Sequence, residues 1–156
     1  MMETRKIIVL RGLQGSGKST WAKQWVNEDP EHRVRFNRDD IRNMLGPYWV
    51  PSRENLIDSI YWNLLQDATL AGYNIVIDNM NLNEKYIEDI KKFVEETNLL
   101  SLAYSRYEVE IKDFFHVPLQ TCIERDAQRE HPIGEQVIRN TYNKYKDKIL
   151  VWQDLT

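Results

Sequence analysis

The chain has 156 residues, of which 42% are hydrophobic and 29% charged, and its formal net charge is −3. This length is typical of one domain, so residues 1–156 are expected to fold as a single unit. The small acidic excess argues against a basic protein that coats long duplex nucleic acid, and no apolar run approaches the roughly 18 residues of a membrane-spanning helix. The only cysteine is Cys122, which excludes an intrachain disulfide and favours a reducing, cytoplasmic location without a membrane partner.

Short apolar runs alternate along the chain with segments of helical period. Strands are expected at residues 6–10, 33–37 and 74–78, and a less regular one within 104–115. Helices are expected at 18–27, at 40–45, between a capping Ser52 and a closing Gly72, after a capping Asn83, at 118–129 and after Gly134. The alternation predicts an α/β fold, with a parallel sheet of about four or five strands covered by helices on both faces. Ligands of such sheets bind at the carboxyl ends of the strands.

The first expected strand is followed by Gly-Leu-Gln-Gly-Ser-Gly-Lys-Ser-Thr at residues 12–20. A glycine, four free positions and then Gly-Lys-Ser form the phosphate-loop pattern, and the strand before it and helix after it supply the required context. Small residues let consecutive backbone N–H groups surround a phosphate, and the helix N-terminus favours an anion. The pattern predicts ATP binding, with Lys18 at the β- and γ-phosphates and the hydroxyl of Ser19 on Mg²⁺. The expected nucleotide-binding residues are Gly12, Gly15, Ser16, Gly17, Lys18, Ser19 and Thr20.

The third expected strand ends in Asp78, where phosphate-loop proteins hold the carboxylate that organises Mg²⁺. Asp78 is therefore a predicted metal ligand, with a plain turn or helix cap as the alternative. Asn79 follows it, at the position where a hydrolytic ATPase often has a glutamate that activates water. This difference argues against a motor or AAA-type enzyme and against hydrolysis.

The second expected strand leads into Asn-Arg-Asp-Asp-Ile-Arg at residues 37–42. A kinase needs a carboxylate that takes the proton from the attacking hydroxyl, and Asp39 and Asp40 lie where an acceptor would approach. The alternative is that one aspartate caps the helix expected to start near residue 40. Arg38 and Arg42 flank the pair with guanidinium forks suited to a phosphate on the acceptor.

Two further features have more than one interpretation. Arg125 and Arg129 lie four positions apart on an expected helix, a spacing that is unfavourable for like charges unless they share an anion such as a transferring phosphoryl group. A solvated helix face is the alternative. Trp49 lies in a proline-flanked loop, where it either stacks on a base or packs the loop onto the core.

Together these segments resemble the 5′-kinase domain of bacteriophage-type polynucleotide kinases. They run in the order of that family and extend over nearly the whole chain. The resemblance implies a phosphate-loop NTPase of the adenylate-kinase-like type, which uses ATP and Mg²⁺ to phosphorylate a 5′-hydroxyl end of DNA or RNA. The matching segments are Gly12–Ala22, Asn37–Arg42, Asn81–Asn83, Val117 with Pro118, Arg125 with Arg129, and Val137–Arg139 with Tyr142.

The resemblance also implies roles for individual residues. Asp39 matches the general base, and Arg42 the residue at the acceptor-side phosphate and the reaction centre. Arg129 matches an arginine of a helical lid around residues 118–134, with Arg125 as its companion. The expected substrate contacts are Arg38, Asp39, Arg42 and Asn81.

The sequence departs from the family pattern at Gln14, where proline is common, and at Met80, which replaces a small hydroxyl residue. The second departure leaves the contacts after the third strand open. Three other functions also stay open: a kinase of a hydroxymethylated base in phage DNA, a small nucleoside or nucleotide kinase, and a non-catalytic nucleotide-binding module.

Overall fold

The computed structural model describes residues 3–100 and 105–148. Its centre is a sheet of four strands in the order β2-β3-β1-β4, and every neighbouring pair is parallel. The predicted α/β architecture is confirmed. The strands are β1 (Thr4–Arg11), β2 (Arg33–Phe36), β3 (Asn74–Ile77) and β4 (Arg106–Asp113).

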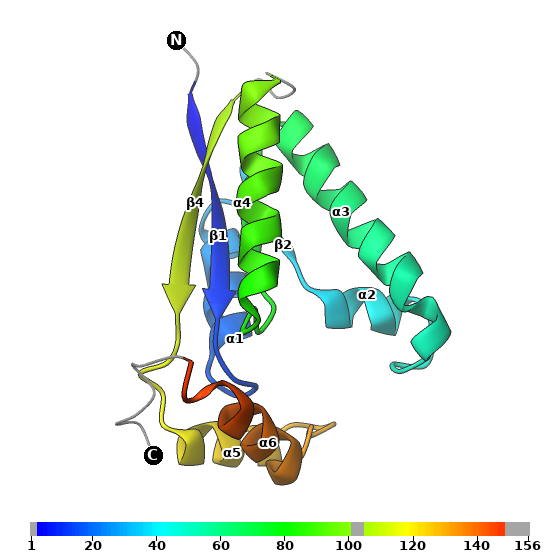
Figure 1. Cartoon of the computed structure of the whole chain (residues 1–156), viewed down its shortest axis with the longest axis vertical. Helices are drawn as coiled ribbons and strands as arrows, with labels where there is room; N and C mark the ends of the chain where they lie inside the picture. Colours follow the sequence, from blue (N-terminus) through cyan, green and yellow to red (C-terminus); the bar gives the residue numbers. More distant parts are fainter. Residues whose placement is uncertain (1–2, 101–104, 149–156) are drawn as a thin grey trace.

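Helices lie on both faces of this sheet and beyond one end of it. Figure 1 shows α3 and α4 in front, diverging from each other toward the carboxyl ends of the strands, while α5 and α6 lie below those ends. The helices are α1 (Lys18–Glu28), α2 (Arg38–Met44), α3 (Glu54–Leu70), α4 (Glu84–Leu99), α5 (Leu119–Ala127) and α6 (Glu135–Tyr145), with a 3₁₀ turn η1 (Pro51–Arg53) before α3.

The alternation of side chains along the central strands explains the two covered faces. In β1, Ile7 and Val9 pack in the cluster that includes α3 and α4, whereas Ile8 and Leu10 pack in the cluster around α1. Successive side chains of a strand point to opposite faces, so a strand covered on both sides is apolar at every position. All four of these side chains are at most 5% exposed.

A third hydrophobic cluster joins α5 and α6 to the loops at the carboxyl ends of the strands. Leu13 of the phosphate loop and Leu82 from the loop after β3 are buried in it. From the helices, Cys122 and Ile138 complete its centre. This packing brings α5 and α6 next to the phosphate loop.

Two of the predicted helix ends are confirmed in detail. Asn83 caps α4, because its side chain accepts a hydrogen bond from the Lys85 N–H. Gly72, with φ of +82°, follows α3, and the N–H groups of Gly72 and Tyr73 return to the carbonyls of Thr69 and Ala68. This is the Schellman pattern, which favours glycine because its backbone turns left-handed there.

Other predicted boundaries are wrong. Ser52 does not cap α3: it lies within η1, and the helix begins at Glu54 after Arg53, without a side-chain cap. The helix expected from residue 40 begins at Arg38, and the helix expected to reach residue 129 ends at Ala127. Residue 104, the first of the segment expected to hold the fourth strand, lies outside the described residues.

Within residues 3–100 and 105–148, none of the helices combines the length and the apolar character that crossing a membrane requires.

Candidate active site

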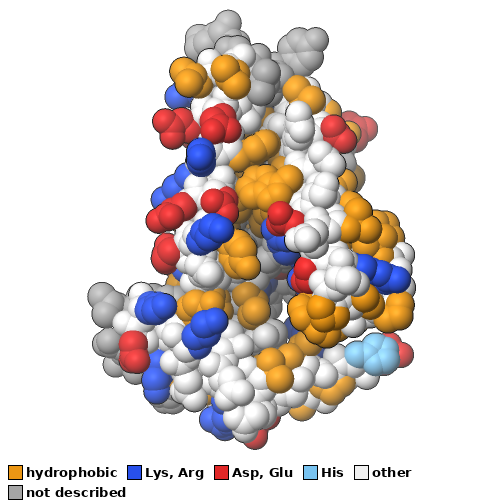
Figure 2. Space-filling model, turned by 45° about the vertical axis from the view of Figure 1, so that its right-hand side comes forward, with side chains coloured by type: hydrophobic (Ala, Val, Ile, Leu, Met, Phe, Trp, Pro, Cys, Tyr) orange, Lys and Arg blue, Asp and Glu red, His pale blue; other side chains and the backbone are white. Residues whose placement is uncertain are grey.

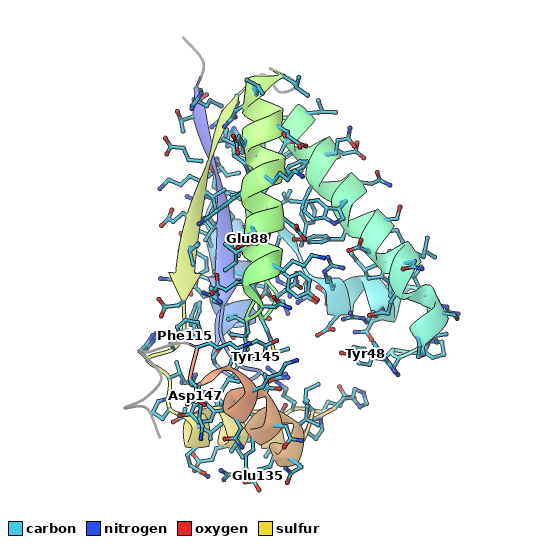
Figure 3. The ribbon with its side chains drawn as sticks, in the orientation of Figure 1. Tyr48, Glu88, Phe115, Glu135, Tyr145 and Asp147 are labelled. Atoms are coloured by element: carbon cyan, nitrogen blue, oxygen red, sulfur yellow. The ribbon has the colours of Figure 1, made fainter. Side chains whose placement is uncertain are left out.

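One cavity of about 260 Å³ lies at the carboxyl ends of β1, β2 and β3, where the topology predicts a ligand. It is walled by the phosphate loop, by α2, by the loop after β3 and by the facing sides of α3 and α4. Residues from the loop after α5 and the end of α6 close its lower side; Tyr145, labelled in Figure 3, is one of them. The lining residues used below are Lys18, Ser19, Arg38, Asp39, Arg42, Tyr61, Trp62, Asp78, Asn81, Tyr86, Ile90 and Arg129.

The phosphate loop forms a turn that ends directly on the first residue of α1. Gly17, with φ of +98°, occupies the N-cap position, and Lys18 opens the helix. The Lys18 Nζ donates to the Gly12 carbonyl at 2.9 Å, to the Leu13 carbonyl at 2.6 Å and to Ser16 Oγ at 3.3 Å. The ammonium is thus held inside the curve of the loop, beside the helix N-terminus that favours an anion.

Lys18 is 7% exposed, and this burial lowers the pKa of its ammonium from 10.5 to about 8, although nearby Asp78 opposes the shift. Burial disfavours the charged form of a lysine. A triphosphate in the loop would supply the counter-charge that the buried ammonium lacks.

The loop is supported from behind by α5. A Cβ built on Gly15, where φ is +78°, would lie 2.3 Å from the Cys122 carbonyl oxygen, so only glycine fits between the loop and this helix. Arg125 of the same helix donates through Nη1 to the Ser16 carbonyl at 3.4 Å. The buried Cys122 is therefore a packing residue of the loop support.

Asp78 lies at the end of β3 and is 1% exposed. Its Oδ2 accepts a hydrogen bond from Arg35 Nε at 2.7 Å. Among the residues that the structure describes, its Oδ1 is buried without a hydrogen-bond partner. A buried carboxylate oxygen without a donor fits a cation, and Ser19 lines the same cavity, so the two residues fit the oxygen donors that Mg²⁺ prefers.

Arg35 is a site residue that the sequence interpretation missed. Its guanidinium bridges Asp78 and Asp40, because Nη1 donates to Asp40 Oδ2 while Nε holds Asp78. Burial lowers the pKa of Arg35, but the two carboxylates outweigh burial and the net shift is upward. Asp40 is thus an ion-pair partner of the Arg35 that orients Asp78. Arg35 is a charged residue within a short strand, and the sequence offered no other signal that such a bridge exists.

The segment from Asn37 to Arg42 forms the start of α2. Asn37 caps the helix by accepting from the Asp40 N–H at 2.9 Å, so the alternative in which an aspartate serves as the cap is wrong. Asn37 also donates through its amide to the Asp78 carbonyl. The cap therefore ties α2 to the end of β3 and fixes the first helical turn, which carries Asp39.

Asp39 lies on the cavity wall with its carboxylate held at one oxygen. Arg42 Nη1 at 2.6 Å and the Tyr48 hydroxyl at 2.9 Å both donate to Oδ1. Burial, and next the charge of Asp39, raise the pKa of Tyr48, so the phenol stays protonated as a donor. Within the described part of the chain, Oδ2 receives no hydrogen bond, so it could accept one from a ligand in the cavity.

Arg42 is committed to neighbouring carboxylates. Its Nε and Nη2 donate to Glu54 of α3, at distances down to 2.7 Å, and its Nη1 to Asp39. The hydrogen bond to Glu54 is the largest of the effects that raise the pKa of Arg42. The planar fork, which the sequence suggested for an acceptor phosphate, is used to link α2 to α3. Trp49 is 60% exposed, so the interpretation that its ring packs the loop onto the core is wrong.

Arg38 is likewise paired with a carboxylate, although the sequence suggested that it binds a phosphate of the acceptor. Its Nη2 donates to Asp58 at 2.9 Å, and its guanidinium carbon lies 4.1 Å from the centre of the Tyr61 ring. Asn81 also lines the cavity, but its side-chain amide donates to the carbonyls of Leu10 and Asn79. With φ of +50°, Asn81 stabilises the turn after β3.

The two arginines near the end of α5 occupy different places. Arg129 lines the cavity and is an ion-pair partner of the buried Asp126 at 3.7 Å. Asp126 in turn accepts from the N–H groups of Ile133 and Gly134, which fixes the connection between α5 and α6. Both arginines thus approach the phosphate loop, Arg125 from behind and Arg129 from the cavity side.

Comparison with known proteins places this site in a family. The family model described as AAA domain matches residues 7–149. Among curated proteins, the chain is 25% identical over 144 residues to an L-seryl-tRNA(Sec) kinase of Methanococcus maripaludis, with 89% of this chain and 52% of the kinase aligned. It is 26% identical over 159 residues to a protein of Autographa californica nuclear polyhedrosis virus named as a bifunctional polynucleotide kinase/RNA ligase, with 91% and 21% aligned.

Solved structures share the fold. A chain of the Pnkp1/Rnl/Hen1 RNA repair complex superposes with a TM-score of 0.73 at 22% identity, over 96% of this chain and 47% of the other. A chain of a second Pnkp1/Rnl/Hen1 structure gives 0.63 at 25% identity, over 80% and 40%. The chain thus spans about half the length, or less, of the relatives that it matches.

These comparisons confirm the phosphate-loop kinase resemblance and the fold class. They also correct one expectation. The presence of Asn79 after Asp78 argued against an AAA-type protein, yet the matching family carries that description. The residue after Asp78 is therefore no guide to the family, whereas the relatives named as kinases agree with phosphoryl transfer.

Proposed function

We propose that this chain, which belongs to the AAA-domain family of phosphate-loop proteins, transfers the γ-phosphoryl group of ATP to a hydroxyl of a nucleic acid, most simply a 5′-hydroxyl end of RNA or DNA. One observation carries the proposal. A single cavity is lined both by Lys18 and Ser19 of the phosphate loop and by Asp39 of α2, so donor and acceptor groups share one space.

In the proposed reaction, Asp39 Oδ2 takes the proton of the attacking hydroxyl. At the same time, the oxygen of that hydroxyl forms the new bond to the γ-phosphorus. The bond from the γ-phosphorus to the bridging oxygen breaks at the same time, and ADP leaves. Arg42 and Tyr48 hold the other carboxylate oxygen, which fixes the direction of Oδ2. In protein kinases, too, an aspartate accepts the proton of the substrate hydroxyl.

The remaining charged residues act on the phosphates. Lys18 neutralises charge on the β- and γ-phosphates from inside the loop, and Arg129 approaches from the segment after α5, a part of the proposed helical lid over residues 118–134. Arg125 lies behind the loop and contacts Ser16, which suits a residue that stiffens the loop. Mg²⁺, held by Ser19 and Asp78 when bound with ATP, would neutralise developing charge on the phosphate oxygens.

The acceptor class is supported by the names of the relatives. One is a kinase of L-seryl-tRNA(Sec), and the other is named as a polynucleotide kinase and RNA ligase. The first name joins a kinase to a tRNA that carries serine, and the second joins a kinase to a polynucleotide. The test below distinguishes this function from three alternatives: a small nucleoside kinase, a kinase of a hydroxymethylated base, and a protein that phosphorylates no acceptor.

The test supplies γ-labelled ATP with four acceptors: 5′-hydroxyl RNA, 5′-hydroxyl DNA, DNA that contains hydroxymethyluracil, and free nucleosides. We expect label on the 5′-hydroxyl polynucleotides. Asp39→Asn should abolish transfer and keep ATP binding, since the amide cannot accept the proton. Label on nucleosides alone, or on no acceptor despite tight ATP binding, would reject the proposal, and full turnover of Asp39→Asn would reject the base assignment.

A further inference from the structure

The cavity continues beyond the catalytic carboxylate into an aromatic end between α3 and α4. Its walls there are Tyr61 and Trp62 of α3 and Tyr86 and Ile90 of α4. Figure 2 shows hydrophobic side chains in the hollow between these two helices, with charged side chains on the flanking ridges. This aromatic end has no part in phosphate chemistry, and its residues lie outside the motifs that predicted the site.

Arg38 forms the wall between the aromatic end and Asp39. Its guanidinium carbon lies over the Tyr61 ring, 4.1 Å from the ring centre, and 5.9 Å from the centre of the Tyr86 ring. Asp58 neutralises its charge through the 2.9 Å ion pair. A neutralised guanidinium over a ring is a surface for another planar group, because arginine stacks on planar groups as well as forming bidentate hydrogen bonds.

The charges argue against a phosphate at this end. Both arginines that could bind one, Arg38 and Arg42, already hold carboxylates, Asp58 and Glu54 respectively. Tyr61 adds no charge, since burial raises the pKa of its phenol further above neutral pH. The group that fits here is planar, apolar on its faces and uncharged, and a nucleobase has these properties.

The size of the space limits how much of a strand can enter. The whole cavity measures about 260 Å³, which is below the roughly 300–1,000 Å³ of most ligand pockets. The aromatic end therefore suits one base and excludes a stack of several. Tyr86 is 50% exposed and stands at the rim, where a base could contact it on entry, whereas Tyr61 is 2% exposed and forms the floor.

We propose that the aromatic end holds the nucleobase of the nucleoside that bears the accepting hydroxyl, stacked against the Arg38–Tyr61 wall and against Tyr86. This inference rests on the proposed function and refines it: the acceptor is recognised by its terminal base, and the hydroxyl is thereby placed at Asp39. Base-to-aromatic stacking contributes about 1–3 kcal/mol per base, which corresponds to roughly 5- to 150-fold in kcat/KM.

The experiment compares two single-stranded acceptors that both carry a 5′-hydroxyl and differ only in the terminal residue, a normal nucleoside or an abasic tetrahydrofuran. For the unaltered protein we expect at least a fivefold lower kcat/KM with the abasic acceptor and the same KM for ATP. Tyr86→Leu should lower kcat/KM for the normal acceptor and bring the ratio of the two acceptors toward one. Glu88→Leu, an exposed position of the same helix outside the cavity lining (Figure 3), should leave the ratio unchanged.

The outcomes separate the two proposals. Equal kcat/KM on both acceptors, or a ratio that Tyr86→Leu does not change, would overturn the base site while leaving polynucleotide phosphorylation intact. Transfer to neither acceptor would overturn the proposed function and this inference together. Because Tyr86 is exposed, its replacement does not disturb the core, and a thermal unfolding curve confirms that the variant is folded.

Discussion

Replacing Lys18 with methionine tests whether burying the Lys18 ammonium inside the phosphate loop lowers the free energy of unfolding of the chain. The side chain keeps its length but loses its ammonium and three hydrogen bonds to the loop. In the folded chain the pKa of Lys18 is lowered from 10.5 to about 8, chiefly by burial. The unfolded chain therefore binds the proton more tightly, and stability must rise with pH between about 8 and 10.5.

The magnitude follows from this shift. Below pH 8 both states carry the proton and the full cost of burying the charge, about 3 kcal/mol, is present. Between pH 7 and 10 the linkage relation predicts that the free energy of unfolding of the unaltered chain rises by roughly 2–3 kcal/mol from this group alone. Lys18→Met lacks that rise. The difference in stability between the two proteins should thus shift by the same amount over this pH range, in favour of the unaltered chain.

The assay is urea unfolding at pH 7, 8, 9 and 10 without nucleotide, with Lys23→Met as the matched control. Lys23 lies on the same helix but is exposed, so its replacement removes a lysine without removing a buried ammonium. A stability difference for Lys18→Met that stays constant from pH 7 to 10 would show that the ammonium is solvated and not buried at a cost inside the loop.

Three further predictions concern the same site. The affinity for an ATP analogue, measured calorimetrically, should fall up to tenfold per pH unit above about pH 8, because deprotonated Lys18 no longer attracts the triphosphate; a flat profile would contradict the pKa. Gly15→Ala should destabilise the chain by more than about 2 kcal/mol in urea unfolding, since its Cβ would lie 2.3 Å from a backbone oxygen of α5, whereas Gly134→Ala has open space and should cost about 1–2 kcal/mol from its backbone strain alone. Arg35→Met should cost about 3–5 kcal/mol by leaving Asp78 buried and unpaired, and adding Asp78→Asn should restore part of that loss; additive losses would mean that the two residues are not coupled.

Local patterns in the sequence predicted much of the donor half of the site. The phosphate loop is formed by residues within nine positions of one another. Gly15 and Gly17 adopt the left-handed backbone that glycine favours, and both glycines are part of the sequence pattern. The central strands β1 and β3 were found because both of their faces are buried, so their apolar residues form unbroken runs. The edge strand β4 alternates with charged residues, and its segment was expected to be less regular. The cap at Asn83 and the closing Gly72 were found because the hydrogen bonds that define these helix ends join residues at most five positions apart.

The acceptor half was decided by contacts that no local pattern contains. Arg42 pairs with Glu54 twelve positions away, Arg38 with Asp58 twenty positions away, and Arg35 with Asp78 forty-three positions away. With 24 acidic residues in the chain, the sequence offers many partners for each arginine and no means to rank them. How α3 crosses α2, and how β2 lies beside β3, selects the distant partner of each arginine. The sequence alone therefore predicted a triphosphate site, and only the tertiary structure decided that Arg38 and Arg42 beside Asp39 pair with carboxylates and that Arg38 borders the aromatic end of the cavity.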